Sequence, residues 1–261
     1  MPKEINKIFG EIDKLINKIN KYKVEPIFSD EIKLRNNRKI SDNLTENEII
    51  ELFTTLIAFS QNANSELVQK IINSGIFKEI FVNFNIDEIV KMNPCDLADK
   101  YWLKIGGIRQ QAKLFHIVSL ARKIKKIGSF AKLLKEAQIP KEIKNEGDIK
   151  QFWNGFHELK KVMEKHKVPF FRSTISLLHL LLEMGYDCVK PDLVVMKVSK
   201  KIGIVDKENG EKNFIETVKV IQKYCIQRRI KPSIIDLYFL IDEGQFASKK
   251  FVKGTFYKKN Y

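Results

Sequence analysis

Asp192 is the residue in this sequence whose type and position best fit catalysis. It directly follows Pro191 in the stretch MGYDCVKPDLVVMKVSKKIGI and precedes a run of apolar and basic residues. A carboxylate beside a reacting centre stabilises developing positive charge, and it can also orient or deprotonate water. An aspartate at such a position is equally typical of a helix N-cap. The sequence therefore leaves two interpretations of Asp192, a catalytic carboxylate and a structural cap.

Metal chemistry has little support in the sequence. The four histidines form no H-x-x-H pattern, and the three cysteines lie far apart with no C-x-x-C pair, whereas zinc and iron–sulfur sites use closely spaced ligands. We therefore expect no metal and no cofactor, and we interpret the cysteines as reduced thiols. These residues are His116, His157, His166, His179, Cys95, Cys188 and Cys225.

The chain carries a large excess of positive charge. Its 261 residues include 47 Lys+Arg against 32 Asp+Glu, which gives a formal net charge of +15. Such an imbalance attracts polyanions and favours nucleic acid as the partner. The alternative is a lysine-rich surface that binds no nucleic acid, because Lys, Asn and Ile are frequent throughout. No apolar run approaches the roughly 20 residues of a membrane span, so we expect a cytoplasmic protein without a membrane partner. With nucleic acid as the favoured partner, we expect it to be nucleoid-associated.

Helical periodicity dominates the chain, which predicts an all-α fold. Apolar residues recur at helical spacing over 46–61, and Thr45 and Glu48 form a plausible capping box before that helix. The valines of CVKPDLVVMKV would also suit a strand, but we favour a helix that starts at Asp192. Further predicted helices are NSELVQKIINSG, two short helices separated at Pro94, IRQQAKLFHIVSLARKIKKIG, SFAKLLKEA, DIKQFWNGFHELKKVMEKH, STISLLHLLLEMG, KNFIETVKVIQKYCIQ and SIIDLYFLIDEG.

Three segments occur in an order that resembles the helix-hairpin-helix DNA glycosylase superfamily. They are LFTTLIAFSQNANSELVQKII, GIRQQAKLFHIVSLARKI and FFRSTISLLHLLLEMGYDCVKPDLVVMKVSKKIGI, which together cover roughly residues 48–205. Two stretches, IGGIRQQAKLFHIVSLAR and FFRSTIS, are similar to the bacterial 3-methyladenine DNA glycosylases. The zinc cluster of those enzymes has no counterpart here, whereas Asp192 matches the acid of the wider superfamily.

The resemblance implies a two-lobed all-α fold with the active site in the cleft between the lobes. We expect a central helical lobe with the hairpin over 47–186. The N- and C-terminal segments, 1–46 and 187–261, would form the second helical lobe. Asp192 would then lie in the cleft.

The resemblance also implies which residues meet the DNA. Gln61 is similar to the family residue that fills the gap left by a flipped base, and aromatic rings can stack on that base. Aromatic residues on helical apolar faces are equally typical of a core. The DNA-binding candidates are Gln61, Gly107, Arg109, Arg172, Ser173 and Thr174, and the base-pocket candidates are Phe59, Trp102, Trp153 and Phe170.

Two basic features are further phosphate candidates. Successive amides of the GGIR turn, with Gly107 and Arg109, can form an anion nest. The cluster at the end of the following helix either faces the DNA backbone or is a solvated helix end. Its members are Arg122, Lys123, Lys125 and Lys126.

The type of reaction depends on where lysines lie. Bifunctional superfamily members carry a nucleophilic lysine at a position that falls on Ser173 or Thr174 here, and neither side chain can form an imine. We therefore predict a monofunctional, monomeric DNA repair glycosylase that hydrolyses the N-glycosidic bond of a damaged base, above all an alkylated purine, in double-stranded DNA. Lys167 and Lys190 keep open an oxidised-purine glycosylase/lyase. The hairpin, which has Pro169-Phe170-Phe171-Arg172 in place of a G-x-G turn, keeps open a non-catalytic nucleic-acid-binding protein.

Overall fold

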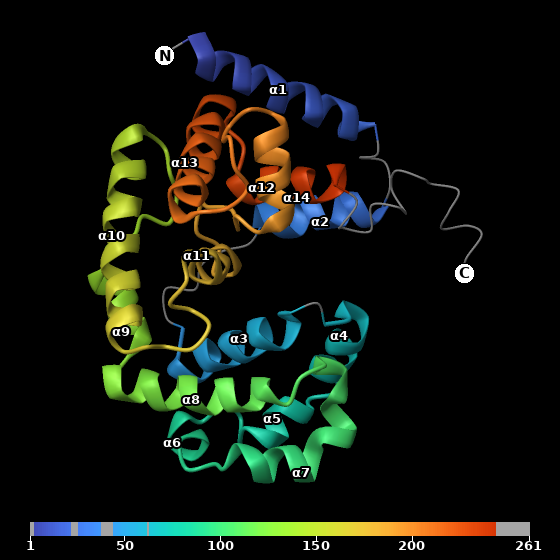
Figure 1. Cartoon of the computed structure of the whole chain (residues 1–261), viewed down its shortest axis with the longest axis vertical. Coiled ribbons are helices and arrows are strands. Elements are labelled where there is room, and N and C mark those ends of the chain that lie inside the picture. Colours follow the sequence, from blue (N-terminus) through green and yellow to red (C-terminus); the bar gives the residue numbers. More distant parts are fainter. Residues whose placement is uncertain (1–2, 22–25, 38–43, 62, 244–261) are drawn as a thin grey trace, which may run out of the picture. The chain divides into compact units, whose positions relative to one another are not determined.

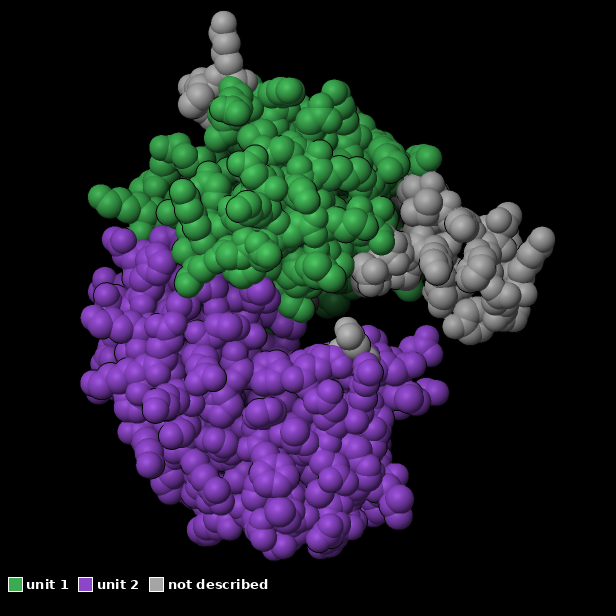
Figure 2. Space-filling model, in the orientation of Figure 1, with its two compact units in different colours: residues 1–40, 140–152, 181–261 green, residues 41–139, 153–180 purple. Residues whose placement is uncertain are grey.

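The structure, a computed structural model, describes residues 3–21, 26–37, 44–61 and 63–243. Every regular element among these residues is a helix, which confirms the predicted all-α class. The chain divides into two compact units, coloured separately in Figure 2. Unit 1 comprises residues 1–40, 140–152 and 181–261, and unit 2 comprises residues 41–139 and 153–180. The predicted cleft between two lobes stays a prediction.

Unit 1 is built around the C-terminal helix α14 (Pro232–Asp242), which contacts α1, α2, α12 and α13 (Figure 1). Pro232 occupies the first helical position, where its missing N–H costs no hydrogen bond. Residues Pro232–Phe239 and Ile241 are all buried, as expected for a helix inside a core. The other helices of unit 1 are α1 (Lys3–Asn20), α2 (Pro26–Asn37), α12 (Leu193–Lys201) and α13 (Glu211–Arg228).

Unit 2 packs α8 (Ala112–Ile127) against α3 (Glu46–Phe59), α6 (Ile86–Ile89) and α7 (Pro94–Ile105). In its core the ring of Phe53 lies 5.1 Å from that of Phe130 and 4.6 Å from that of Phe171, centroid to centroid. The remaining elements are α4 (Ser65–Asn73), α5 (Ile76–Ile80), the 3₁₀ turn η1 (Gly106–Ile108) and α9 (Phe130–Glu136). Helices α10 (Glu146–Lys165) and α11 (Thr174–Glu183) contribute residues to both units.

Several helix ends coincide with local sequence signals, namely a capping box and a proline. The Thr45 side chain accepts from the Glu48 amide, and Glu48 accepts from the Thr45 amide at 2.7 Å, which confirms the capping box. Pro94 does separate two helices, but as the first residue of α7. Helix α3 ends at Phe59, two residues earlier than predicted, because the Ser60 backbone is extended. Helices over 26–37 and 76–80 were not predicted.

Candidate functional site

Asp192 is the N-cap of α12, so the predicted helix start is confirmed. Its backbone is extended, and its Oδ1 accepts from the amides of Val194 at 3.0 Å and Val195 at 3.2 Å. These amides would otherwise have no partner inside the helix. The capping role is therefore real, and a catalytic role would have to use the other carboxylate oxygen.

That other oxygen, Oδ2 of Asp192, faces Lys190. The Lys190 Nζ lies 3.3 Å from it, and the two side chains are 31% and 26% exposed. Solvent and incoming groups can therefore reach the pair. The positive end of α12 also favours negative charge on this carboxylate. The arrangement is an oriented carboxylate with one oxygen fixed by the helix and one held by a movable cation.

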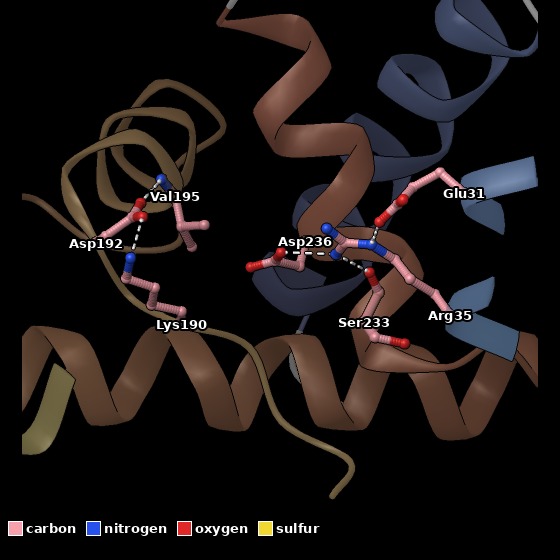
Figure 3. A network of polar contacts seen from close by, with 7 residues as sticks. All are labelled: Glu31, Arg35, Lys190, Asp192, Val195, Ser233 and Asp236. Atoms are coloured by element: carbon pink, nitrogen blue, oxygen red, sulfur yellow. Dashed lines mark hydrogen bonds and ion pairs between the residues drawn. The ribbon is translucent and has the colours of Figure 1, made fainter. Parts of the chain in front are cut away.

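A second group of charges lies close to this pair in unit 1, on α2 and α14 (Figure 3). Arg35 is its centre: Nη1 donates to Asp236 Oδ2 at 2.8 Å and to the Ser233 carbonyl at 2.7 Å, while Nε donates to Glu31 at 2.7 Å. The side chains of Arg35 and Asp236 are only 11% and 6% exposed. A buried ion pair requires such additional hydrogen bonds, because both charges lose their hydration.

The two groups of charges act on each other. Burial raises the pKa of Asp236, although the Arg35 guanidinium opposes that shift. The negative charge of Asp192 adds to the rise, and the positive charge of Lys190 works against it. Burial also disfavours the charged form of Arg35, but Asp236 and Glu31 outweigh it and raise the pKa of that guanidinium. Charges of alternating sign therefore extend from the partly exposed Asp192–Lys190 pair to the buried pair of Asp236 and Arg35.

In unit 2, Lys113 fixes the turn that carries Gln61. Lys113 is fully buried, and its Nζ donates to the carbonyls of Ala58 at 2.9 Å and Ser60 at 2.7 Å. These carbonyls belong to the last turn of α3, where cations are favoured and acceptors need partners. Gln61 follows at φ +55 with its side chain exposed. The predicted gap-filling residue is thus presented to solvent from a firmly held turn.

This buried role of Lys113 was not predicted from the sequence. The signal was its position, because Lys113 falls on the same helical face as Ile117, Ala121 and Ile124, which are all buried. A lysine on a buried face needs acceptors, and the nearest helix end supplies them.

The GGIR turn is used for packing. A Cβ atom added to Gly107 would lie 2.8 Å from Ile71 Cδ1 and 3.2 Å from Leu67 Cβ, so glycine lets η1 approach α4. The Arg109 amide donates to the Gly106 carbonyl at 2.8 Å. Arg109 itself is exposed and has a φ of +78. The need for glycine at position 107 is therefore explained without an anion nest.

The predicted hairpin turn lies between α10 and α11. Lys167 and Phe170 adopt φ values of +52 and +69, a left-handed conformation that usually requires glycine. The ring of Phe170 contacts those of His116 and Phe171, with centroids 5.8 Å and 6.1 Å apart. The turn thus has the backbone conformation of a glycine turn, but an aromatic side chain occupies the glycine position.

The three DNA-binding candidates after this turn differ in exposure. Arg172 and Ser173 are exposed, and the Ser173 Oγ accepts from the Ser176 amide at 3.2 Å at the start of α11. Thr174, by contrast, is 4% exposed. Thr174 is therefore buried, and its assignment as a DNA contact stays a prediction. The sequence signal for this burial is that Thr174 is the first residue of the apolar helix α11.

The base-pocket candidates differ in exposure. Phe59 and Trp102 are half-buried, and Trp102 lies beside Gly106, whose added Cβ would be 3.7 Å from the indole. Trp153 is 3% exposed, with its ring 5.2 Å from that of Phe156 and 6.0 Å from that of His157. Trp153 is therefore buried in the core, and its role as a stacking surface stays a prediction.

The basic cluster at the end of α8 is largely used within the protein. Arg122 donates to the carbonyls of Val90 at 3.0 Å and Met92 at 2.8 Å, and Lys125 donates to Asp87 at 2.7 Å. These contacts favour the interpretation as a helix end with structural partners.

Asp192 belongs to unit 1, and the DNA-binding and base-pocket candidates all belong to unit 2.

Among the described residues, no three His, Cys, Asp or Glu side chains are grouped to hold a metal ion. None of the helices described here has both the length and the apolar character to cross a bilayer. Comparisons with protein-family models, with curated proteins and with solved structures give no match to this chain.

Proposed function

We propose that the protein is a DNA glycosylase that flips a damaged base out of double-stranded DNA and hydrolyses its N-glycosidic bond. The observation that carries this proposal is the geometry of Asp192, whose Oδ1 is held by two backbone amides while Oδ2 stays partly exposed. Cleavage of that bond builds positive charge on the sugar, and an oriented carboxylate stabilises this charge without reorganising. The resemblance to helix-hairpin-helix glycosylases and the net charge of +15 support DNA as the substrate.

An alkylated purine is the substrate that we favour, because the similar stretches point to the 3-methyladenine enzymes. In this proposal Asp192 orients the attacking water, and Gln61 and Arg172 contact the opened duplex. Phe59, Trp102 and Phe170 remain half-buried and available to line a base pocket. We expect such an enzyme to act as a monomer on nucleoid DNA in the cytoplasm.

A glycosylase/lyase is the second candidate, and one observation favours it. The amine of Lys190 lies 3.3 Å from Asp192, so a possible nucleophile lies beside the carboxylate proposed for catalysis. In that reaction the lysine amine would form a bond to the sugar carbon as the bond to the base breaks. The sugar ring would then open to give an imine, and elimination of the 3′ phosphate would cut the strand without added alkali.

The experiment that tests the proposal measures free-base release from duplexes that carry alkylated, oxidised or deaminated bases. Wild type and Asp192→Asn are compared, with and without alkali. Asparagine keeps the cap but loses the charge. We expect release that disappears in Asp192→Asn and strand cleavage that needs alkali.

Asp148→Asn is the matched control, because Asp148 also accepts from backbone amides, those of Lys144 at 2.8 Å and Asn145 at 3.1 Å. It should release base like wild type. Cleavage without alkali would favour the lyase. Absence of release from every duplex, with equal DNA binding by wild type and Asp192→Asn, would leave a non-catalytic binding protein.

A further inference from the structure

The Lys190 ammonium has a second carboxylate nearby, that of Asp236. Asp236 lies between Arg35 on one side and the Lys190–Asp192 pair on the other (Figure 3). Arg35 binds Asp236 through Oδ2 at 2.8 Å. The charge of Lys190 already acts on Asp236, whose pKa it lowers against the effect of burial.

Lys190 and the carboxylate of Asp236 differ in how firmly they are held. Asp236 is fixed in the core of unit 1 by Arg35, which is itself held by Glu31 and the Ser233 carbonyl. Lys190 is a compact charge on a flexible four-carbon stem, is 31% exposed, and can change rotamer without disturbing the backbone. The cation is therefore the movable partner between two fixed anions.

The contact between Lys190 and Asp192 works against the proposed reaction. An ammonium group on Oδ2 neutralises part of the charge that a developing sugar cation requires. Like charges also repel, so a cationic sugar and Lys190 cannot share this oxygen favourably. For Asp192 to act, Lys190 has to move away from Oδ2. If the ammonium then pairs with the buried carboxylate of Asp236, neither charge is left unpaired.

We propose that Asp236 is a positioning residue for the base-release reaction: it receives the Lys190 ammonium when the sugar reaches Asp192, and this transfer frees Oδ2. No bond is made or broken in this step, and the proton stays on Lys190. The inference rests on the proposed function, but the sharing of Lys190 between two carboxylates can be tested without activity.

The first test is the crystal structure of Asp192→Asn. Removal of the charge at position 192 should bring Lys190 Nζ into hydrogen-bonding distance of Asp236, because the remaining carboxylate is then the better acceptor. A Lys190 side chain that instead extends into solvent would overturn the inference. The other ionisable groups near Asp236 are Glu31, Arg35 and the buried thiol of Cys188.

The second test is a double-mutant cycle of Asp236→Asn and Lys190→Met in single-turnover base release at saturating protein. Asp236→Asn should slow release roughly tenfold or more when Lys190 is present and have little effect in the Lys190→Met background, because Asp236 acts through Lys190. Lys190→Met alone should exceed the wild-type rate, because Oδ2 of Asp192 is then free without any transfer, whereas loss of a nucleophilic lysine would lower the rate and overturn the inference. An equal loss from Asp236→Asn in both backgrounds would mean a structural role and would overturn the inference.

Asp242→Asn is the matched control, since Asp242 is also a buried carboxylate on α14 but is paired with Lys18 at 2.9 Å and Lys201 at 2.7 Å. Its effect on base release should be the same with and without Lys190. If wild type releases no base from any duplex, the proposed function fails. The Asp192→Asn crystal structure then still decides whether Lys190 is shared.

Discussion

At the residue scale, Asp192 caps a helix, and the proposed base release would place a second requirement on the same carboxylate. Asp192 caps a helix through Oδ1 and presents Oδ2 to a partly exposed lysine. A cap requires only a hydrogen-bond acceptor, so Asn and Ser serve as well as Asp. Stabilisation of a sugar cation requires a negative charge. The two requirements can therefore be separated by the choice of substitution.

Substitution of Asp192 by alanine should lower the free energy of unfolding by about 0.5–2 kcal/mol, because two helix amides lose their acceptor. Asp192→Asn should stay close to wild type, since asparagine keeps the cap and an exposed ion pair contributes only about 0–1 kcal/mol. Denaturant unfolding of the three proteins measures this. If asparagine costs as much as alanine, the contact with Lys190 is the stabilising interaction and the cap is not.

Lys167 is strained in the hairpin turn and is exposed, so it can be replaced without loss of core packing. Lys167→Gly should raise the free energy of unfolding by about 0.5–1 kcal/mol, because glycine adopts the left-handed conformation without a steric cost. Thermal or denaturant unfolding checks the change. Lys161→Gly, at an exposed helical position in α10, should instead lower stability by about 1 kcal/mol. A loss at both positions would mean that the turn is not strained.

At the element scale, Lys113 joins the start of α8 to the end of α3. Its two hydrogen bonds are local to unit 2 and determine where the Ser60–Gln61 turn lies. Burial and the charge of Arg109 lower the pKa of Lys113 to about 8. The ammonium group is therefore held in an environment that favours loss of its proton.

This shift predicts a pH dependence of stability. The pKa of Lys113 is about 8 in the folded state against the ordinary 10.5, so between these values the unfolded chain binds more protons. The free energy of unfolding should then rise with pH from about 8 upward, by at most about 1.4 kcal/mol per pH unit. Lys113→Met should remove this rise and cost about 1–3 kcal/mol at pH 7, since two carbonyls lose their donor. Denaturant unfolding at several pH values compares the two proteins, and parallel curves would contradict the assignment.

Element ends were predicted well where the signal is local, and residue environments were not. The Thr45 capping box and the Asp192 helix start need only neighbouring residues, and both were found. Asp236 lies in the apolar run SIIDLYFLIDEG, but its partner Arg35 is 201 residues away, so no local pattern could pair them. Trp153 is a base-pocket candidate in the sequence and is buried in the structure. Its burial depends on which elements pack over it, and no local pattern shows that.

At the scale of the whole molecule, charge dominates the expected behaviour toward DNA. A net charge of +15 predicts binding that weakens steeply with salt, because phosphate contacts release counterions. Which cations take part depends on their partners inside the protein. Arg172 is exposed beside the hairpin turn, whereas Arg122 donates to two carbonyls.

Arg172→Ala should reduce the slope of log affinity against log salt by about 1 for any duplex, because one phosphate contact is lost. Arg122→Ala is the matched control and should leave the slope nearly unchanged. Fluorescence anisotropy over a range of salt concentrations measures both. A larger change for Arg122→Ala would identify the end of α8 as the DNA-binding surface.

Unit 1 is built from segments that lie far apart in the sequence, which affects how the chain folds during synthesis. Helices α1 and α2 pack against α14, and roughly 190 residues separate α2 from α14 in the sequence. At about 5–20 residues per second, a ribosome needs roughly 10–40 s to produce that helix, while unit 2 is complete by residue 180. Protease digestion of ribosome-bound chains of increasing length should therefore protect unit 2 first. Helices α1 and α2 emerge before α14, so the apolar faces that pack against α14 should be open to chaperones until it follows.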